Sequence, residues 1–179
     1  MPSRPDLRPN GFLLRTHSKE YLDTLFRDFM MTGFGFGTLD GTISQRISRW
    51  HPDVIEAARR NIQSYKRYRH LLSGDVYHLV SQSPLYVPDE GDTNQWDILE
   101  YAKSDGSEAV VFFFRGGLQG ATRKTALKGL RTTVDYVVTS LNSGQSETVS
   151  GRRLVERGFD VDLKGNRTSE ILLIESISS

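Results

Sequence analysis

The 179-residue sequence contains no cysteine, which excludes disulfide bonds and thiolate chemistry as sources of stability or activity. No apolar run is long enough to cross a membrane, and the opening stretch MPSRPDLRPNGF lacks the hydrophobic segment of a signal peptide. The hydrophobic share of 37% and the charged share of 25% are instead typical of a soluble globular protein. The length predicts one domain, or one domain and a piece of another.

The net charge of +1 conceals two halves of opposite sign. Residues 1–70 carry an excess of five positive charges, whereas residues 71–179 carry an excess of four negative charges. Near the same point the hydrophobic pattern changes from a helical period to a strand period. We therefore predict a loose N-terminal arm over residues 1–17, a helix-strand-helix segment over 18–75, and a β-domain over 76–179.

Two helices are predicted in the first half of the chain. In residues 18–31, apolar side chains recur in pairs every four residues, and Ser18 suits the N-cap. In residues 51–75, Pro52 suits the first turn and Gly74 the C-terminal cap. The apolar stripe expected on this second helix consists of Ile55, Ala58, Ile62, Tyr65 and Leu72.

Between the helices, residues 30–41 read MMTGFGFGTLDG and hold glycines at every second position, Gly33, Gly35 and Gly37. A dinucleotide-binding loop requires a different glycine spacing and opens directly into a helix. Here the next helix begins only at Pro52, too far away for its amide groups to bind the same phosphate. The pattern indicates a short strand in which glycine permits close approach of a neighbouring backbone.

Beyond residue 75 the pattern indicates a mainly β fold, an antiparallel sandwich or barrel with an N-terminal α/β piece. Turn signals such as Ser104-Asp105-Gly106 and Asn142-Ser143-Gly144 separate short apolar runs. Seven strands are predicted, over residues 76–80, 96–104, 108–115, 122–130, 134–141, 152–163 and 169–177.

Several of these segments together resemble the C-terminal region of alpha-galactosidases of glycoside hydrolase family 36. The run FRDFMMTGFGFG at residues 26–37 resembles the last barrel strand of that family, and YKRYRHLLSGDVYHL at 65–79 resembles the stretch that follows it. Further segments similar in order and spacing are Trp96-Asp97, EAVVFFFR, LKGL and SGRRLVERGFDVDL. The resemblance covers approximately residues 20–175.

The resemblance implies a β-sandwich preceded by the last strand and helices of an incomplete (β/α)8 barrel. A complete barrel requires about 250 residues, whereas about 75 precede the sandwich. The family's nucleophile, an Asp in a Lys-x-Asp motif, and its acid/base Asp both belong to upstream parts of the barrel. We therefore expect no catalytic, cofactor-binding or metal-binding residue in this chain, and no cofactor.

Two acidic motifs invite a catalytic interpretation. Lys103-Ser104-Asp105 fits Lys-x-Asp literally, but it lies in a Ser-Asp-Gly sequence that favours a turn. Asp160 and Asp162 share one strand face about 7 Å apart, which overlaps the carboxylate separation in inverting glycosidases. Because apolar residues occupy the opposite face, the pattern indicates the wet side of a half-buried strand. The same aspartates only partly match a calcium loop.

A basic cluster on the second helix invites a nucleic-acid interpretation. Arg69 instead falls within the apolar stripe, which predicts a buried ion pair, with Asp75 as the expected partner. The four histidines, His17, His51, His70 and His78, show no metal-ligand spacing. The basic cluster on the second helix is explained equally well as a solvated helix face, so no nucleic-acid or membrane partner is expected. The cluster consists of Arg59, Arg60, Lys66, Arg67 and His70.

We predict a C-terminal fragment of an alpha-galactosidase-like hydrolase that is inactive alone, the parent enzyme acting on galactosides. The alternative is a self-standing module that binds carbohydrate or protein, with Trp96 and Tyr101 as a sugar platform. The chain is expected to self-associate through an apolar patch, whereas residues 73–179 alone should stay monomeric. The patch would consist of Phe29, Phe34, Phe36 and Trp50.

Overall fold

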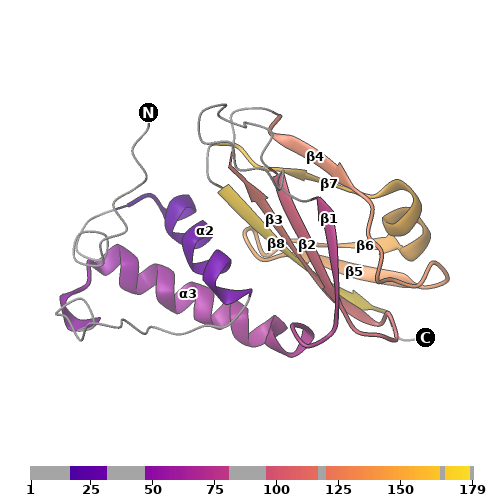
Figure 1. Ribbon diagram of the computed structural model, residues 1–179, viewed down its shortest axis with the longest axis horizontal. Coiled ribbons are helices and arrows are strands. Elements are labelled where there is room, and N and C mark those ends of the chain that lie inside the picture. Colours follow the sequence, from indigo (N-terminus) through magenta and orange to yellow (C-terminus); the bar gives the residue numbers. More distant parts are fainter. Residues whose placement is uncertain (1–16, 32–46, 81–95, 117–119, 166–167, 178–179) are drawn as a thin grey trace. The chain divides into compact units, whose positions relative to one another are not determined.

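The computed structural model describes residues 17–31, 47–80, 96–116, 120–165 and 168–177 (Figure 1). The chain forms two compact units, one ending at Tyr65 and the other beginning at Lys66. The glycine-rich segment with Gly33, Gly35 and Gly37 lies outside the described residues, so the predicted strand there stays a prediction. In the described part, no helix is both long and apolar enough to cross a membrane.

The first unit contains helix α2 (Lys19–Met30), the short 3₁₀ helix η2 (Ile47–Arg49) and most of helix α3 (Pro52–Tyr68). The predicted N-cap is confirmed, because the Ser18 hydroxyl accepts a hydrogen bond from the Tyr21 backbone N–H at 3.2 Å. Pro52 begins α3, as predicted. The apolar core of this unit consists of Leu22, Phe26, Met30, Trp50, Val54, Ala57 and Ala58.

A buried polar cluster joins the two helices. The carboxylate of Asp23 on α2 accepts hydrogen bonds from Asn61 at 2.7 Å and from Arg60 at 3.0 Å, both on α3. It also accepts one from Lys19 at 2.9 Å, one helical turn away. Arg60 therefore belongs to the helix pair rather than to the solvated basic face on which the sequence pattern placed it.

The end of α3 belongs to the second unit. The helix continues into the 3₁₀ turn η3 (Arg69–Leu71), where Tyr68 and Leu71 are fully buried. Arg69 is exposed, so the predicted buried ion pair with Asp75, itself exposed, is wrong. The buried side of α3 is formed by Val54, Ala57, Ala58, Asn61 and Tyr68, whereas the stripe members Ile55, Ile62 and Tyr65 are only partly buried, so Arg69 lies beside the buried face rather than within it.

Gly74 was predicted as the C-terminal cap of this helix, but the helical segment ends at Leu71 and its cap is Leu72. The backbone of Gly74 instead lies against β2, where an added Cβ would stand 2.2 Å from the carbonyl oxygen of Ala102. Close backbone approach therefore requires glycine at this position.

The second unit is built on a six-stranded antiparallel sheet, whose strand order is β1-β2-β3-β8-β5-β6 (Figure 1). Neighbours β2 and β3 pair from Trp96 with Arg115 to Ala102 with Ala109. The strands are β1 (Asp75–Val80), β2 (Trp96–Ala102), β3 (Glu108–Arg115), β5 (Asp135–Ser140), β6 (Ser146–Ser150) and β8 (Thr168–Ser176).

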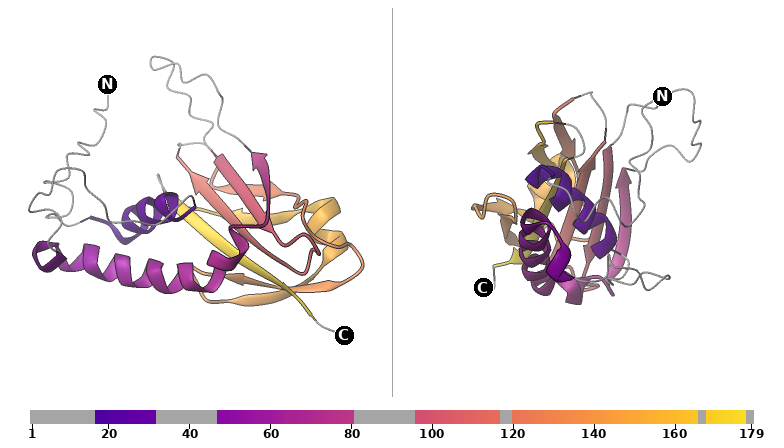
Figure 2. Two further views of the ribbon diagram at one scale, coloured as in Figure 1. Left: turned by 60° about the horizontal axis from the view of Figure 1, so that its bottom comes forward. Right: turned by 90° about the vertical axis from the view of Figure 1, so that its left-hand side faces the viewer.

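A second, two-stranded sheet of β4 (Thr122–Thr125) and β7 (Phe159–Asp162) faces the first across the main core (Figure 2). The predicted antiparallel β-domain is thus confirmed. The origin of residues 18–75 as a piece of a barrel remains a proposal. The core side chains come from both sheets and from the loops between them, and include Trp96, Ile98, Val111, Phe113, Leu127, Leu130, Tyr136, Leu154, Val161, Leu163 and Ile174.

Two predicted strands were wrong in part. Residues 152–163 contain a π-helical turn, Arg153–Arg157, before the short strand β7. In residues 122–130 the strand ends at Thr125. Strand β6 was missed, because Val149 is the only buried residue in SETVS. An edge strand with so few apolar residues gives a weak periodic signal.

Candidate functional site

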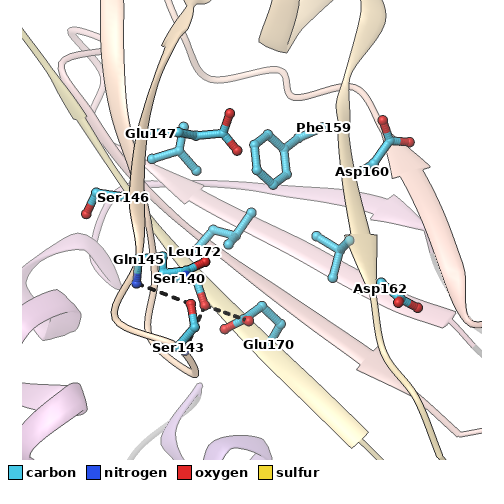
Figure 3. A pocket seen from close by; sticks show the side chains of 12 residues that line it. Ser140, Ser143, Gln145, Ser146, Glu147, Phe159, Asp160, Asp162, Glu170 and Leu172 are labelled. Carbon is cyan, nitrogen blue, oxygen red and sulfur yellow. Dashed lines mark hydrogen bonds between the residues drawn. The ribbon is translucent and has the colours of Figure 1, made fainter.

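A cavity of about 230 Å³ opens between the two sheets, where β5, β6, β7 and β8 meet (Figure 3). Its apolar side is formed by residues of the main core, Val138, Val161 and Leu172, together with the partly buried ring of Phe159. Its polar residues come from the β5–β6 turn, from β6 and β8, and from β7, where the side chains of Asp160 and Asp162 point away from the cavity (Figure 3). The polar lining consists of Ser140, Ser143, Gln145, Ser146, Glu147, Asp160, Asp162 and Glu170.

One end of the cavity is held by a hydrogen-bond network around Glu170. The carboxylate of Glu170 accepts from the Ser140 hydroxyl at 2.9 Å and from the backbone N–H groups of Asn142 and Ile171. The Ser140 hydroxyl in turn accepts from the Ser143 N–H, which fixes the β5–β6 turn. Figure 3 shows the Ser140–Glu170 contact at the lower end of the cavity.

The opposite wall carries Asp160 and Asp162, which both point into solvent from β7 (Figure 3). The residue between them, Val161, is buried, so the prediction of a half-buried strand with a wet side is confirmed. Lys124 lies 3.6 Å from Asp160, and Lys164 lies 3.8 Å from Asp162. Each aspartate thus has a nearby cation that partly compensates its charge.

A fully buried carboxylate, Glu100 on β2, serves a structural purpose. It accepts hydrogen bonds from the backbone N–H groups of Lys128 at 2.7 Å and Gly129 at 2.9 Å. Burial raises the pKa of Glu100, although the two backbone donors act in the opposite direction. The contacts hold the LKGL segment, residues 127–130, against the sheet.

The Lys-x-Asp sequence lies in the turn between β2 and β3, as predicted. Asp105 accepts a hydrogen bond from the Ser107 N–H at 2.8 Å, which is an Asx-turn contact. Lys103 instead contacts Glu108, whose other oxygen lies 2.9 Å from Nε2 of His70. These hydrogen bonds from His70 and Lys103 lower the pKa of Glu108.

The suggested sugar platform is wrong. Trp96 is 4% exposed and Tyr101 is 8% exposed, so neither ring presents a face to a ligand. Of the basic cluster, Arg60 is bound to Asp23, whereas Arg59, Lys66, Arg67 and His70 are exposed. In the described segments, no three His, Cys, Asp or Glu side chains are grouped so that they could hold a metal ion.

The cavity itself was missed by sequence reasoning. Its wall includes Glu147, which lies on the unpredicted strand β6, and Ser143 and Gln145, which read only as turn residues. The one sequence signal for this cavity was the alternation of Phe159, Asp160, Val161 and Asp162. It indicated a strand with one buried face, but not which residues of other strands face it.

The fold places the second unit among two-sheet antiparallel β-domains, and comparison of its sequence with known families narrows this class. Residues 96–174 match the family model described as the glycosyl hydrolase family 36 C-terminal domain. Residues 96–174 are therefore similar to the C-terminal domain of glycoside hydrolase family 36, in agreement with the resemblance seen in the sequence. No curated protein is matched by the sequence.

Solved structures have the same fold. The GH36 alpha-galactosidase AgaA from Geobacillus stearothermophilus is 22% identical, with a TM-score of 0.58, over 73% of this chain and 17% of its own. The alpha-galactosidase from Lactobacillus brevis is 17% identical, with a TM-score of 0.57, over 74% of this chain and 18% of its own. The chain thus spans less than a fifth of these enzymes.

A third match extends over more of the chain. The alpha-amylase from Geobacillus thermoleovorans, complexed with acarbose, is 15% identical, with a TM-score of 0.55. It covers 90% of this chain and 35% of its own. Variants of AgaA were solved in complex with raffinose and with stachyose. At these identities the likeness establishes the fold.

Proposed function

We propose that this chain is the C-terminal part of an alpha-galactosidase-like glycoside hydrolase and carries none of its catalytic residues. The observation that supports this most directly is the family match over residues 96–174, which is specific to a C-terminal domain. The matched alpha-galactosidases are several times longer, and this chain covers 17% of AgaA. In this proposal, residues 18–75 are the last helix-strand-helix piece of a catalytic barrel.

The parent enzyme would hydrolyse terminal alpha-galactosides with two carboxylates. One would attack the anomeric carbon and form a covalent glycosyl-enzyme, while the other would protonate the departing glycosidic oxygen. The carboxylate that acted as the acid would then deprotonate a water molecule, which releases the sugar with retained configuration. Both would belong to parts of the barrel other than this chain.

The contacts of the acidic residues in this chain support its lack of catalytic groups. Asp105 caps a turn, Glu100 is buried against backbone donors, and Asp160 and Asp162 lie beside lysines on an exposed strand face. The chain alone should therefore release no nitrophenol from a nitrophenyl alpha-galactoside. Release that disappears in Asp160→Asn or Asp105→Asn would overturn this assignment.

The natural polypeptide provides the decisive test. An antibody against residues 96–179 should isolate, from the cells that produce it, a protein much larger than 20.3 kDa. That protein should cleave nitrophenyl alpha-galactoside and leave the beta-galactoside intact. A 20.3 kDa protein without activity would contradict the proposal and favour the alternative, a non-catalytic module that binds carbohydrate or a protein partner.

A further inference from the structure

We infer that the cavity between β6 and β7 binds one sugar ring of a neutral carbohydrate. The inference is carried by the walls of the cavity and involves no hydrolysis, so it stands or falls separately from the activity of the parent enzyme. The site is defined by Gln145 and Glu147 on one wall and by the ring of Phe159 on the other, whereas the side chains of Asp160 and Asp162 point away from it (Figure 3).

The size of the cavity favours a small ligand. Its volume of about 230 Å³ lies below the range of about 300–1,000 Å³ found for sites that take drug-sized molecules. An elongated peptide or a nucleotide would leave most of its surface outside. One pyranose ring, with its neighbours extending into solvent, is a ligand of suitable size.

The lining combines an aromatic ring with hydrogen-bonding groups, as sugar recognition requires. A pyranose has apolar C–H faces and a circumference of hydroxyls, so it can pack against Phe159 while its hydroxyls donate to carboxylates. In the part of the chain that the structure describes, the side chains of Gln145 and Glu147 make no hydrogen bond with the protein. They are therefore available to a ligand.

The charge distribution favours a neutral ligand over a cation. Lys124 and Lys164 partly compensate Asp160 and Asp162, and Glu170 already receives hydrogen bonds from Ser140 and two backbone N–H groups. The described carboxylates of the cavity do not form a group that could hold a metal ion.

The test is a titration of the complete 179-residue chain with raffinose, galactose and sucrose, followed by NMR of backbone amides. We expect saturable shifts confined to β6, β7 and the β5–β6 turn, with weak affinity, on the order of 1 mM, because the cavity is open. No saturable shift with any of the three sugars, or shifts outside this cavity, would overturn the inference. So would saturable binding of calcium or putrescine at these residues without binding of sugar.

Two variants locate the site. Glu147→Ala, at an exposed position, should weaken sugar binding about tenfold, and Phe159→Ala should abolish it. Glu156→Ala removes a carboxylate of the same type from the neighbouring π-helical turn, outside the cavity, and should leave the affinity unchanged. Phe159 also contacts the core. If Phe159→Ala does not fold, the affinity of Glu147→Ala alone tests the assignment. Equal affinity of wild type and Glu147→Ala would contradict the assignment.

Discussion

The ring of Tyr68 meets the ring of Phe112 edge-on, with centroids 5.3 Å apart and an interplanar angle of 85°. Tyr68 is the last residue of α3, and Phe112 lies in the middle of β3; both are fully buried. The end of the helix is therefore a part of the β-domain, and a fragment of residues 73–179 would lose the side chains of Tyr68 and Leu71. That residues 73–179 stay monomeric alone remains a prediction, and residues 66–179 would keep both of these side chains.

Tyr68→Ala should lower the free energy of unfolding by about 3–5 kcal/mol, because a large buried aromatic ring leaves a cavity. Its neighbour Arg67 is exposed, so Arg67→Ala should change the free energy by less than about 0.5 kcal/mol. Urea denaturation of both variants measures the difference. Similar midpoints would show that Tyr68 does not support the sheet.

Glu100→Gln should also destabilise the β-domain. The carboxylate accepts from two adjacent backbone N–H groups, those of Lys128 and Gly129. An amide has one oxygen, so its NH₂ group would face one of these donors, at a cost of about 1–3 kcal/mol. The matched control, Glu147→Gln on the exposed edge strand β6, should leave the denaturation midpoint nearly unchanged. Equal losses in the two variants would contradict the anchoring role of Glu100.

The sequence predicted the strands whose apolar content is itself sufficient. β3 contains an unbroken buried run from Ala109 to Phe114, and its position was predicted to the residue. β6 was missed because its pairing with β5, rather than its own composition, makes it a strand. The role of Glu100 could not be foreseen for a similar reason, since its partners are backbone groups 28 and 29 residues away.

The cavity was beyond sequence reasoning because its walls come from β5, β6, β7 and β8, which meet only in the folded chain. Asp160 and Asp162 were recognised as an exposed pair, yet nothing local indicates that Glu147 lies opposite. Arg69 illustrates the reverse error. A continuous 3.6-residue period placed it on a stripe with Ile62 and Tyr65, which are only partly buried, whereas the buried side of α3 is that of Asn61 and Tyr68.

The contact between His70 and Glu108 should make stability depend on pH. Hydrogen bonds from His70 and Lys103 hold the pKa of Glu108 below its ordinary value. The stabilisation is therefore fully present above the unfolded-state pKa of about 4.3 and is lost as pH falls through the folded-state pKa. The loss of stability in Glu108→Gln, relative to wild type, should accordingly be larger at about pH 6 than at about pH 3. An equal loss at both pH values would rule out this linkage.

Asp23→Ala should destabilise the helix pair of the first unit. Asp23 is 5% exposed and accepts hydrogen bonds from Lys19, Arg60 and Asn61. Burial by itself raises the pKa of Asp23, but hydrogen bonds from Lys19 and Asn61 and the charges of Arg27 and Lys19 lower it overall, so the ionised form is the one stabilised. Removing it leaves the buried Asn61 amide and the Arg60 guanidinium without this acceptor, at a cost of about 1–3 kcal/mol.

Glu20→Ala, on the exposed side of the same helix, is the control for Asp23→Ala and should cost less than about 0.5 kcal/mol. Circular dichroism at the helical minimum during urea titration reports the unfolding of both variants. An Asp23→Ala protein as stable as the Glu20 variant would show that the polar cluster contributes nothing.

The last prediction is self-association of the complete chain through its first unit. Phe29 on α2 is 56% exposed and Ile47 is 54% exposed, whereas Trp50, expected in the same patch, is buried. Phe34 and Phe36 lie outside the described residues. Burying one large apolar side chain yields roughly 1.5–3 kcal/mol, so a second copy that covers Phe29 would be stabilised. Light scattering should show a mass that rises with concentration for the complete chain and falls towards 20.3 kDa in Phe29→Ser. Residues 66–179, which retain Tyr68 and Leu71, should stay monomeric at the same concentrations; a monomeric complete chain would contradict the prediction.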